Sequence, residues 1–338
     1  MSDPIITALM TTYNCADYVE ETMISILAQT FTDFEFLIID DGSSDDTCAR
    51  IRQFDDRRIR LYSEPDNQGV GARLNQALSL IRTPYIAKVD ADDISLPHRF
   101  SQQLQFLQKH PQFGIAKSYF EYFTDDPLVA QSDRFRQFRS VKEAEHNCVN
   151  QPDDIAQQLR RWNCVIHTSY FAKTDVVKQI GYVKSRVGED YSLFYKAAKA
   201  GVIIGCVPEV LVRMRLSQNS VTTKPDSAFH FAQALTALKY DELSALAKRH
   251  GSLWLYGTGG LAKGMAKAFA EHGIVLAGFI DRQAGSLILE DGEDYRVLPL
   301  TTDLARGLVI AAQPVRAEIL QFFLDAGWQE WADFMVIA

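Results

Sequence analysis

The sequence predicts an α/β fold built on a parallel sheet, followed by a second, smaller α/β domain. Apolar strand-like runs alternate with amphipathic helical patterns from Ile5 to about Val89, and this alternation favours a parallel sheet covered on both faces. The alternation restarts at residue 253 after a long helical stretch, which indicates a domain boundary near residue 250. The chain has 338 residues, 47% of them apolar and 23% charged, which suits two globular domains.

The first four strands and their intervening helices follow from hydrophobic periodicity. The strands are predicted at IITALMTTYN, FEFLIID, RIRLYSE and TPYIAKVD. In the first helical segment, DYVEETMISILAQT, the apolar residues Val19, Met23, Ile26 and Leu27 fall on one helical face. The segments DDTCARIRQF and GARLNQALSLI continue the pattern. Ligands of such sheets bind at the carboxyl ends of the strands.

The remaining elements set the predicted domain limits. Residues 121–165 are polar and irregular, and we expect an insertion beside the site there. A strand and a helix follow in VIHTSYFAKTDVVKQIG, then a helix in GEDYSLFYKAAKAG and a strand in VIIGCVPEVLVRMRL. We therefore predict a first domain over 1–225, a helical linker over 226–250 and a second domain over 251–338.

Charge and cysteine content narrow the functional classes. The formal net charge is −8, which argues against nucleic acid as a partner because no general basic surface is available. The five cysteines are scattered and form no CxxC pair, so neither a disulfide framework nor a zinc site is indicated. No apolar run approaches the length of a membrane span. We expect a cytoplasmic protein, with membrane contact at most peripheral at the inner face and an oligomeric state left open.

The residues at the strand ends are the candidates for ligand binding and catalysis. They read TTYN, DDGSSDD, SEPDNQG and DADD, all polar and two of them rich in aspartate. In extended backbone Asp90 and Asp92 would project to the same side, with Ala91 facing away. Carboxylates at this spacing suit Mg²⁺ or Mn²⁺ together with substrate phosphates. An acidic turn that leads into the next helix explains the same residues, and the segment alone leaves both interpretations open.

Five motifs in order extend this pattern over residues 4 to 222. MTTYN, IIDDGSSDDT, NQGVGARLNQAL, YIAKVDADDISLPHRF and GEDYSLF together resemble the family 2 glycosyltransferases with the GT-A fold. The resemblance implies transfer of a sugar from a nucleotide diphosphate sugar, commonly UDP-linked, with inversion at the anomeric carbon. The acceptor would be a glycan, a lipid-linked oligosaccharide or a protein.

The resemblance also implies roles for single residues. Thr11 and Tyr13 match residues that line the nucleotide, and Asp41, with Asp40 beside it, matches the acid that reads the base. Asp92 is then the direct metal ligand, with Asp90 nearer the ribose, and Arg73 is a further nucleotide-side candidate. Alternatives remain for several of these: Tyr13 as an aromatic at the core edge, Asp40 and Asp41 as a turn, and Arg73 as the partner of a helix neighbour.

The resemblance places the reaction's base in GEDYSLF. Asp190 matches the catalytic base, with Glu189 as its supporter, although acids at a helix start are common in any protein. His167 is a candidate contact on the acceptor side, although a lone histidine is more often structural. Many relatives carry an Arg-x-His pattern where this chain reads Arg215, Leu216 and Ser217, so a third protein ligand for the metal is in doubt.

The second domain carries a glycine motif. Gly257, Gly259 and Ala262 fit G-x-G-x-x-A between a strand and a helix, and Asp281 ends the next strand, which is the context of a dinucleotide site. The segment resembles the small Rossmann-like domain of some sugar acyltransferases. Glycines also permit close packing of helix on strand without a ligand, and we favour that explanation or a docking role for the domain. The alternative functions are a nicotinamide-dependent oxidoreductase and a non-catalytic protein that binds sugar nucleotides or assembles with partners.

Overall fold

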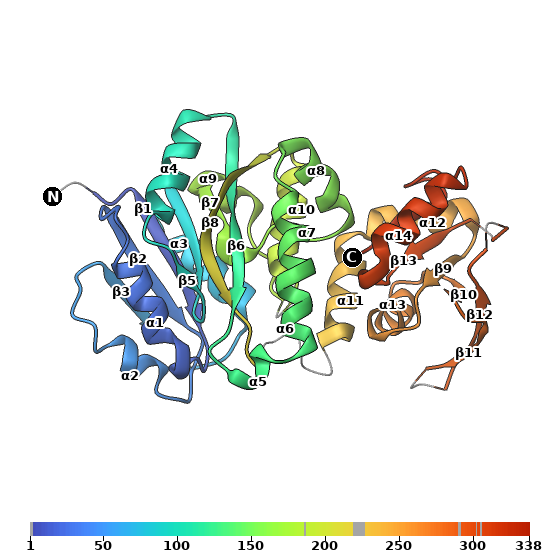
Figure 1. The fold of residues 1–338 in the computed structure, drawn as a ribbon, viewed down its shortest axis with the longest axis horizontal. Helices are drawn as coiled ribbons and strands as arrows, with labels where there is room; N and C mark the ends of the chain where they lie inside the picture. Colours follow the sequence, from blue (N-terminus) through green and yellow to red (C-terminus); the bar gives the residue numbers. More distant parts are fainter. Residues whose placement is uncertain (1–2, 186, 219–226, 290–291, 302, 305) are drawn as a thin grey trace. The chain divides into compact units, whose positions relative to one another are not determined.

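The computed structural model describes residues 3–185, 187–218, 227–289, 292–301, 303–304 and 306–338. They form two compact units, divided between Ser220 and Val221 (Figure 1). In each unit a sheet is accompanied by helices, so the α/β class predicted from the sequence is confirmed.

The first unit is built on an eight-stranded sheet in the order β3-β2-β1-β4-β7-β6-β8-β5. The strands are β1 (Ile6–Thr12), β2 (Phe34–Asp40), β3 (Ile59–Ser63), β4 (Tyr85–Asp90), β5 (Ile94–Ser95), β6 (Phe113–Phe123), β7 (Phe171–Lys173) and β8 (Ile203–Arg215). The first four are mutually parallel, as predicted. β7 is antiparallel to both of its neighbours, β4 and β6, and the long strand β6 was not singled out in the sequence.

Helices cover the faces of this sheet. They are α1 (Ala16–Leu27), α2 (Thr47–Ile51), α3 (Val70–Leu80), α4 (Arg99–Lys109), α5 (Pro127–Ala130), α6 (Asp133–Gln137), η1 (Phe138–Lys142), α7 (Glu143–Cys148), α8 (Pro152–Arg161), η2 (His167–Ser169), α9 (Thr174–Ile180) and α10 (Glu189–Lys199). The apolar sides of α1, α2 and α4 pack against one face of β1, β2 and β4. The polar residues 121–165 form mostly short helices rather than an open loop.

Strand register brings the carboxyl ends of the central strands level. Thr12 pairs with Asp40 between β1 and β2, and Thr11 pairs with Asp90 between β1 and β4. The polar strand ends noted in the sequence therefore meet along one edge of the sheet, where parallel α/β sheets bind ligands.

The second unit has a six-stranded sheet in the order β11-β12-β10-β9-β13-β14. Its strands are β9 (Leu253–Tyr256), β10 (Leu276–Asp281), β11 (Gly285–Ile288), β12 (Asp294–Pro299), β13 (Leu308–Ile310) and β14 (Phe334–Val336). All pairs are parallel except the pair of β11 and β12. Its helices are α11 (Ser227–Leu238), α12 (Tyr240–His250), α13 (Gly260–Glu271), η4 (Gln313–Val315) and α14 (Arg316–Asp325).

The segment 226–250, predicted as a linker, contains two packed helices. The chain from Val221 onward groups with the second unit, and α11 lies against α13 at Gly264. A Cβ at Gly264 would lie 2.9 Å from Cβ of Ala232 and 3.1 Å from Cα of Phe229. Glycine is therefore required there by the close approach of two helix backbones, because a side chain would have to displace main-chain atoms.

We predict that Gly264→Ala destabilises the second unit although alanine is the better helix former by about 1 kcal/mol. Overpacking of this kind costs about 1–3 kcal/mol. Gly259→Ala is the matched control, because a Cβ at Gly259 would meet no atom within 4 Å and its φ is −74°. Thermal unfolding should show a lower midpoint for Gly264→Ala alone. Equal midpoints for both variants would contradict the packing argument.

Candidate active site

The acidic segment starts at the end of β4, above a buried lysine. Lys88 is fully buried, and its Nζ donates to the carbonyl oxygen of Val89 at 2.7 Å and pairs with the Asp90 carboxylate. The strand ends at Asp90, where the amide of Asp93 donates to the Asp90 carbonyl at 3.3 Å and closes a turn. The extended backbone expected as far as Asp92 is therefore replaced by this turn.

The three aspartates are in different electrostatic environments. Burial alone would raise the pKa of Asp90, but the charge of Lys88 prevails and holds that pKa below its ordinary value. Burial and the charge of Asp90 raise the pKa of Asp92 to about 6. Burial and the charge of Asp92 raise the pKa of Asp93 well above its ordinary value, and its Oδ1 accepts the amide of Arg215 at 2.8 Å. The cluster is thus short of positive charge at Asp92.

The donor set fits a divalent cation held partly by substrate. Asp90 keeps a third of its side chain exposed, and the two carboxylates offer the hard oxygen ligands that Mg²⁺ and Mn²⁺ prefer. Within the described ranges no group of three or more His, Cys, Asp or Glu residues could hold a metal ion. Mg²⁺ commonly takes one or two protein carboxylates and completes its shell with phosphates and water.

A second pair of acids begins α10. Gly188 has the left-handed conformation (φ 74°) directly before the helix, and Glu189 and Asp190 lie in its first turn. The Asp190 carboxylate accepts two hydrogen bonds, one at each oxygen. Nδ2 of Asn163 donates to Oδ2 at 2.8 Å and the amide of Tyr191 donates to Oδ1 at 2.6 Å. The position of Asp190 at a helix start, predicted from the sequence, is confirmed.

The pKa values of these two acids differ. Burial is the largest influence on both, and with the charge of Asp190 it raises the pKa of Glu189 to about 8. The pKa of Asp190 rises only to about 6, because hydrogen bonds from Tyr191 and Asn163 oppose burial and the charge of Asp90. At neutral pH Asp190 is the ionised member of the pair. The influence of Asp90 on both pKa values also shows that the two acid clusters share one region.

His167 lies inside the protein between the clusters. It is 9% exposed, its Nδ1 is 3.9 Å from Oε1 of Glu189, and its Nε2 is 3.4 Å from the hydroxyl of Tyr182. Burial and the charge of Lys88 lower the pKa of His167 to about 3, so the imidazole is neutral. An acceptor contact for His167 stays a prediction, and its observed neighbours are the buried acid and a tyrosine.

The acids after β2 are bound to surrounding backbone. The Asp41 carboxylate accepts the amides of Gln68 and Gly69, both at 2.8 Å, and Nε of Arg73 at 2.7 Å. Both side chains of the Asp41–Arg73 pair are only 5% exposed. The pair fixes the start of α3 beside the strand ends. This contact joins distant segments, whereas the turn considered from the sequence involves only neighbouring residues.

Tyr13 and Asp40 complete the group of strand-end residues. Asp40 accepts hydrogen bonds from the hydroxyl of Thr12 at 2.9 Å and the amide of Ser43 at 2.9 Å, which tie the loops after β1 and β2. Tyr13 is 50% exposed and precedes Asn14, a non-glycine residue with positive φ (49°). An exposed ring on a loop fixed in this way is available to stack on a flat ligand.

Three supporting residues were missed or undervalued in the sequence. Lys88 follows an ordinary strand pattern, and Asn163 lies 27 positions before Asp190, so neither contact has a local signal. Arg215 was noted only for the missing histidine after it. Its Nε donates to the Asp92 carbonyl at 2.9 Å, and its guanidinium pairs with Glu21 and Asp125.

Comparison with known proteins finds relatives of the first unit. Residues 7–171 match the family described as Glycosyl transferase family 2. A Haemophilus influenzae protein described as an uncharacterized glycosyltransferase is 25% identical over 242 residues, which is 70% of this chain and 72% of that protein.

Two solved structures share the fold. The structure of S. aureus TarS 1-349 in complex with UDP-GlcNAc has a TM-score of 0.52 and 17% identity, and the match covers 70% of this chain and 66% of that one. The mannosyltransferase PcManGT from Pyrobaculum calidifontis, in complex with GDP-Man and Mn²⁺, also has a TM-score of 0.52 and 17% identity, with coverage of 81% and 76%. At this identity they support the fold predicted from the sequence and nothing beyond it.

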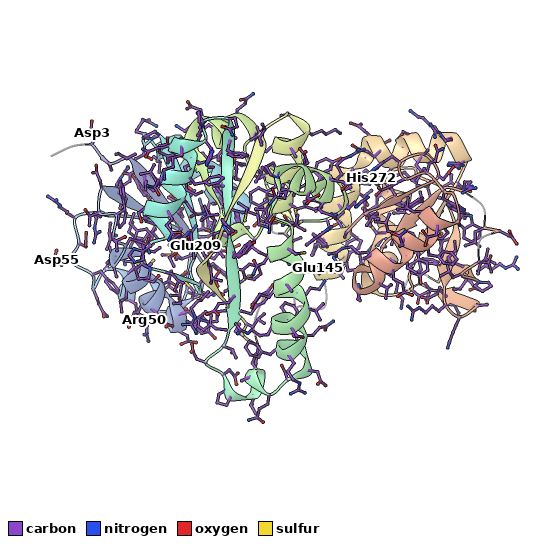
Figure 2. All side chains as sticks on the ribbon, turned by 45° about the horizontal axis from the view of Figure 1, so that its top comes forward. Asp3, Arg50, Asp55, Glu145, Glu209 and His272 are labelled. Atoms are coloured by element: carbon purple, nitrogen blue, oxygen red, sulfur yellow. The ribbon has the colours of Figure 1, made fainter. Side chains whose placement is uncertain are left out.

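We predict that Arg73→Met lowers the free energy of unfolding by about 3 kcal/mol or more, because it leaves a buried carboxylate without its cation. Arg50→Met is the control: its pair with Glu20 is more than a third exposed on both sides, and Figure 2 places Arg50 at the periphery of the first unit. That variant should lose less than about 1 kcal/mol. Denaturant titration followed by circular dichroism compares them, and equal losses would refute a structural role for the Asp41–Arg73 pair.

Proposed function

Because the first unit is a family 2 glycosyl transferase domain, we propose that this enzyme transfers a sugar from a nucleotide diphosphate sugar, with inversion, to a hydroxyl of its acceptor. The observation that carries the proposal is the presence of two acid clusters in one electrostatic environment. Asp90 ends β4 and Asp92 lies in the turn after it, and the charge of Asp90 reaches Asp190 at the start of α10. One cluster suits the diphosphate and the other suits the acceptor.

We propose that the nucleotide sugar binds at the carboxyl ends of β1 and β2. Thr11, the exposed Tyr13 and the loop held by Asp40 would line the nucleotide, and Asp41 with Arg73 would keep that loop and α3 in place. TarS is described in complex with UDP-GlcNAc and PcManGT in complex with GDP-Man, so nucleotide diphosphate sugars are bound on this fold. We favour a UDP-sugar for this chain.

Mn²⁺ or Mg²⁺ is the proposed cofactor, and Asp92 with Asp90 would hold it. When bound, the cation supplies positive charge to the leaving diphosphate. Support comes from the carboxylate pair itself, from the raised pKa of Asp92, which marks a carboxylate short of a cation, and from the Mn²⁺ described with PcManGT. Asp93 and Arg215 would fix the turn that carries Asp92.

Asp190 is the proposed general base. Its carboxylate takes the proton from the acceptor hydroxyl as that oxygen attacks the anomeric carbon and the nucleotide diphosphate departs from the opposite side. Glu189, with the higher pKa, stays protonated beside it and adds no second negative charge. A hydrolase that inverts needs both an acid and a base, whereas a diphosphate leaving group needs no proton, so one ionised carboxylate suffices.

The acceptor class stays open among a glycan, a lipid-linked oligosaccharide and a protein. No helix in the described part of the chain is long and apolar enough to cross a membrane. The helices within residues 121–165 are the proposed location of acceptor recognition.

We predict that Asp92→Ala and Asp190→Ala each lower sugar transfer by about 100-fold or more, while the fold is retained. Transfer from UDP-sugars should also require Mn²⁺ or Mg²⁺ and stop in EDTA. Asp55→Ala is the control, because the Asp55 side chain is exposed and lies between α2 and β3, outside the proposed site. Turnover with radiolabelled donors, beside thermal unfolding, measures both properties. Wild-type turnover in both site variants would remove the assignment.

We predict that the rate of sugar transfer falls as the pH is lowered, because Asp190 must be ionised to act as the base. The pKa of Asp190 is raised to about 6, so the carboxylate is present above that pH and lost below it. The turnover number should fall about tenfold per pH unit below pH 6 and level off above it. A profile between about pH 5 and 8 at saturating donor and metal measures this. A flat profile across that range would exclude Asp190 as the base.

A further inference from the structure

Among the described residues, the side chain of Asn163 holds the carboxylate of Asp190 from outside its own helix. Nδ2 of Asn163 donates to Oδ2 at 2.8 Å, while the amide of Tyr191 donates to Oδ1 at 2.6 Å. Two donors at different oxygens fix both the rotation and the plane of a carboxylate. Since the Tyr191 donor is part of the helix itself, Asn163 is the contact that sets the orientation from a separate segment.

Asn163 is carried by a firmly anchored segment between α8 and η2. Its neighbours Trp162, Cys164 and Val165 are buried. The ammonium of Lys117, on β6, donates to the Cys164 carbonyl at 3.1 Å. The Asn163 Oδ1 accepts the amide of Val165 at 3.4 Å, which keeps Nδ2 directed at the acid. A group supported in this way can hold a catalytic side chain with little freedom.

We infer that Asn163 is a positioning residue for sugar transfer, and that its amide holds the Asp190 carboxylate in the orientation that receives the acceptor proton. This inference rests on the proposed function, because it names the residue that prepares the proposed base. An asparagine suits the role: Nδ2 is a donor only, so it binds the ionised carboxylate and cannot take the proton itself.

The charged surroundings make this donor important. Glu189 precedes Asp190 on α10, the charge of Asp90 on β4 acts on both acids, the charge of Lys88 acts on Glu189, and the neutral His167 lies beside Glu189. Burial and the charge of Asp90 raise the pKa of Asp190, and the hydrogen bonds from Tyr191 and Asn163 oppose that rise. Loss of the Asn163 donor therefore weakens the ionised form as well as its orientation.

Asn163→Asp and Asn163→Ala test this in the full-length enzyme. Asn163→Asp keeps the size and shape of the side chain but replaces the donor with an acceptor, and Asn163→Ala removes the group. Asn75→Ala is the matched control: Asn75 is also partly buried, and its Nδ2 donates to the carbonyl oxygen of Tyr182 at 2.7 Å rather than to an acid. Turnover number, KM for the donor, thermal midpoint and the pH profile are measured for each variant.

The inference expects a turnover number lower by roughly 10- to 100-fold in Asn163→Ala, the range for a hydrogen bond to a charged group, and a lower one still in Asn163→Asp. KM for the donor and the thermal midpoint should stay near wild type, and the acidic limb of the pH profile should move to higher pH. A purely structural role would lower the midpoint without moving that limb, and this result would overturn the inference.

The two hypotheses fail in different ways. If the wild-type protein transfers no sugar, or transfers it as well with Asp190→Ala, the proposed function fails and the inference fails with it. If Asp190→Ala is inactive while both Asn163 variants keep the wild-type turnover number and pH limb, the proposed function stands and the role of Asn163 is refuted.

Discussion

The arrangement of the site depends on the ion pair between Lys88 and Asp90. The Lys88 ammonium is fully buried, and a buried cation without a partner costs several kcal/mol. The buried lysine therefore needs Asp90 as its partner, and this ion pair holds Asp90 at the strand end. Asp90 in turn acts on the other acids. Burial is the largest cause of the raised pKa values of Asp92, Glu189 and Asp190, and the charge of Asp90 adds to all three. One pair thus anchors the cluster and leaves its remaining acids short of positive charge.

That shortage explains the separation of roles proposed for the two clusters. At Asp92 the carboxylate lies in a partly exposed turn, where a cation carried in with a phosphate can relieve the repulsion. Around Glu189 and Asp190 no such relief is needed, because one acid keeps its proton and the other is stabilised by two hydrogen-bond donors. The neutral His167 lies between the two acid clusters and adds no charge. Environment, rather than residue type, assigns the roles.

Local sequence predicted those parts that depend on local periodicity. The four parallel strands, the acids at their ends and the start of α10 were all predicted, because apolar runs and helix-start acids are patterns of neighbouring residues. β6 was not, since its run is interrupted by Lys117, whose buried ammonium donates to the carbonyls of His146, Val149 and Cys164. The contacts of Asp41 with Gly69 and of Asn163 with Asp190 span 28 and 27 positions. Periodicity carries no information on such pairs.

The glycine motif of the second unit is another feature whose physical cause the sequence alone does not identify. A phosphate approaching a turn and a helix packing closely on its neighbour both require a missing Cβ, so the letters G-x-G-x-x-A cannot separate the two causes. Distances can. Gly257 has a φ of 105° and a Cβ there would lie 3.1 Å from Cβ of Ala312, and Gly264 faces the α11 backbone. Gly264 lies outside the motif. Gly259, the second glycine of the motif, has a φ of −74° and a Cβ there would meet no atom within 4 Å, so conformation and packing explain Gly257 but not Gly259.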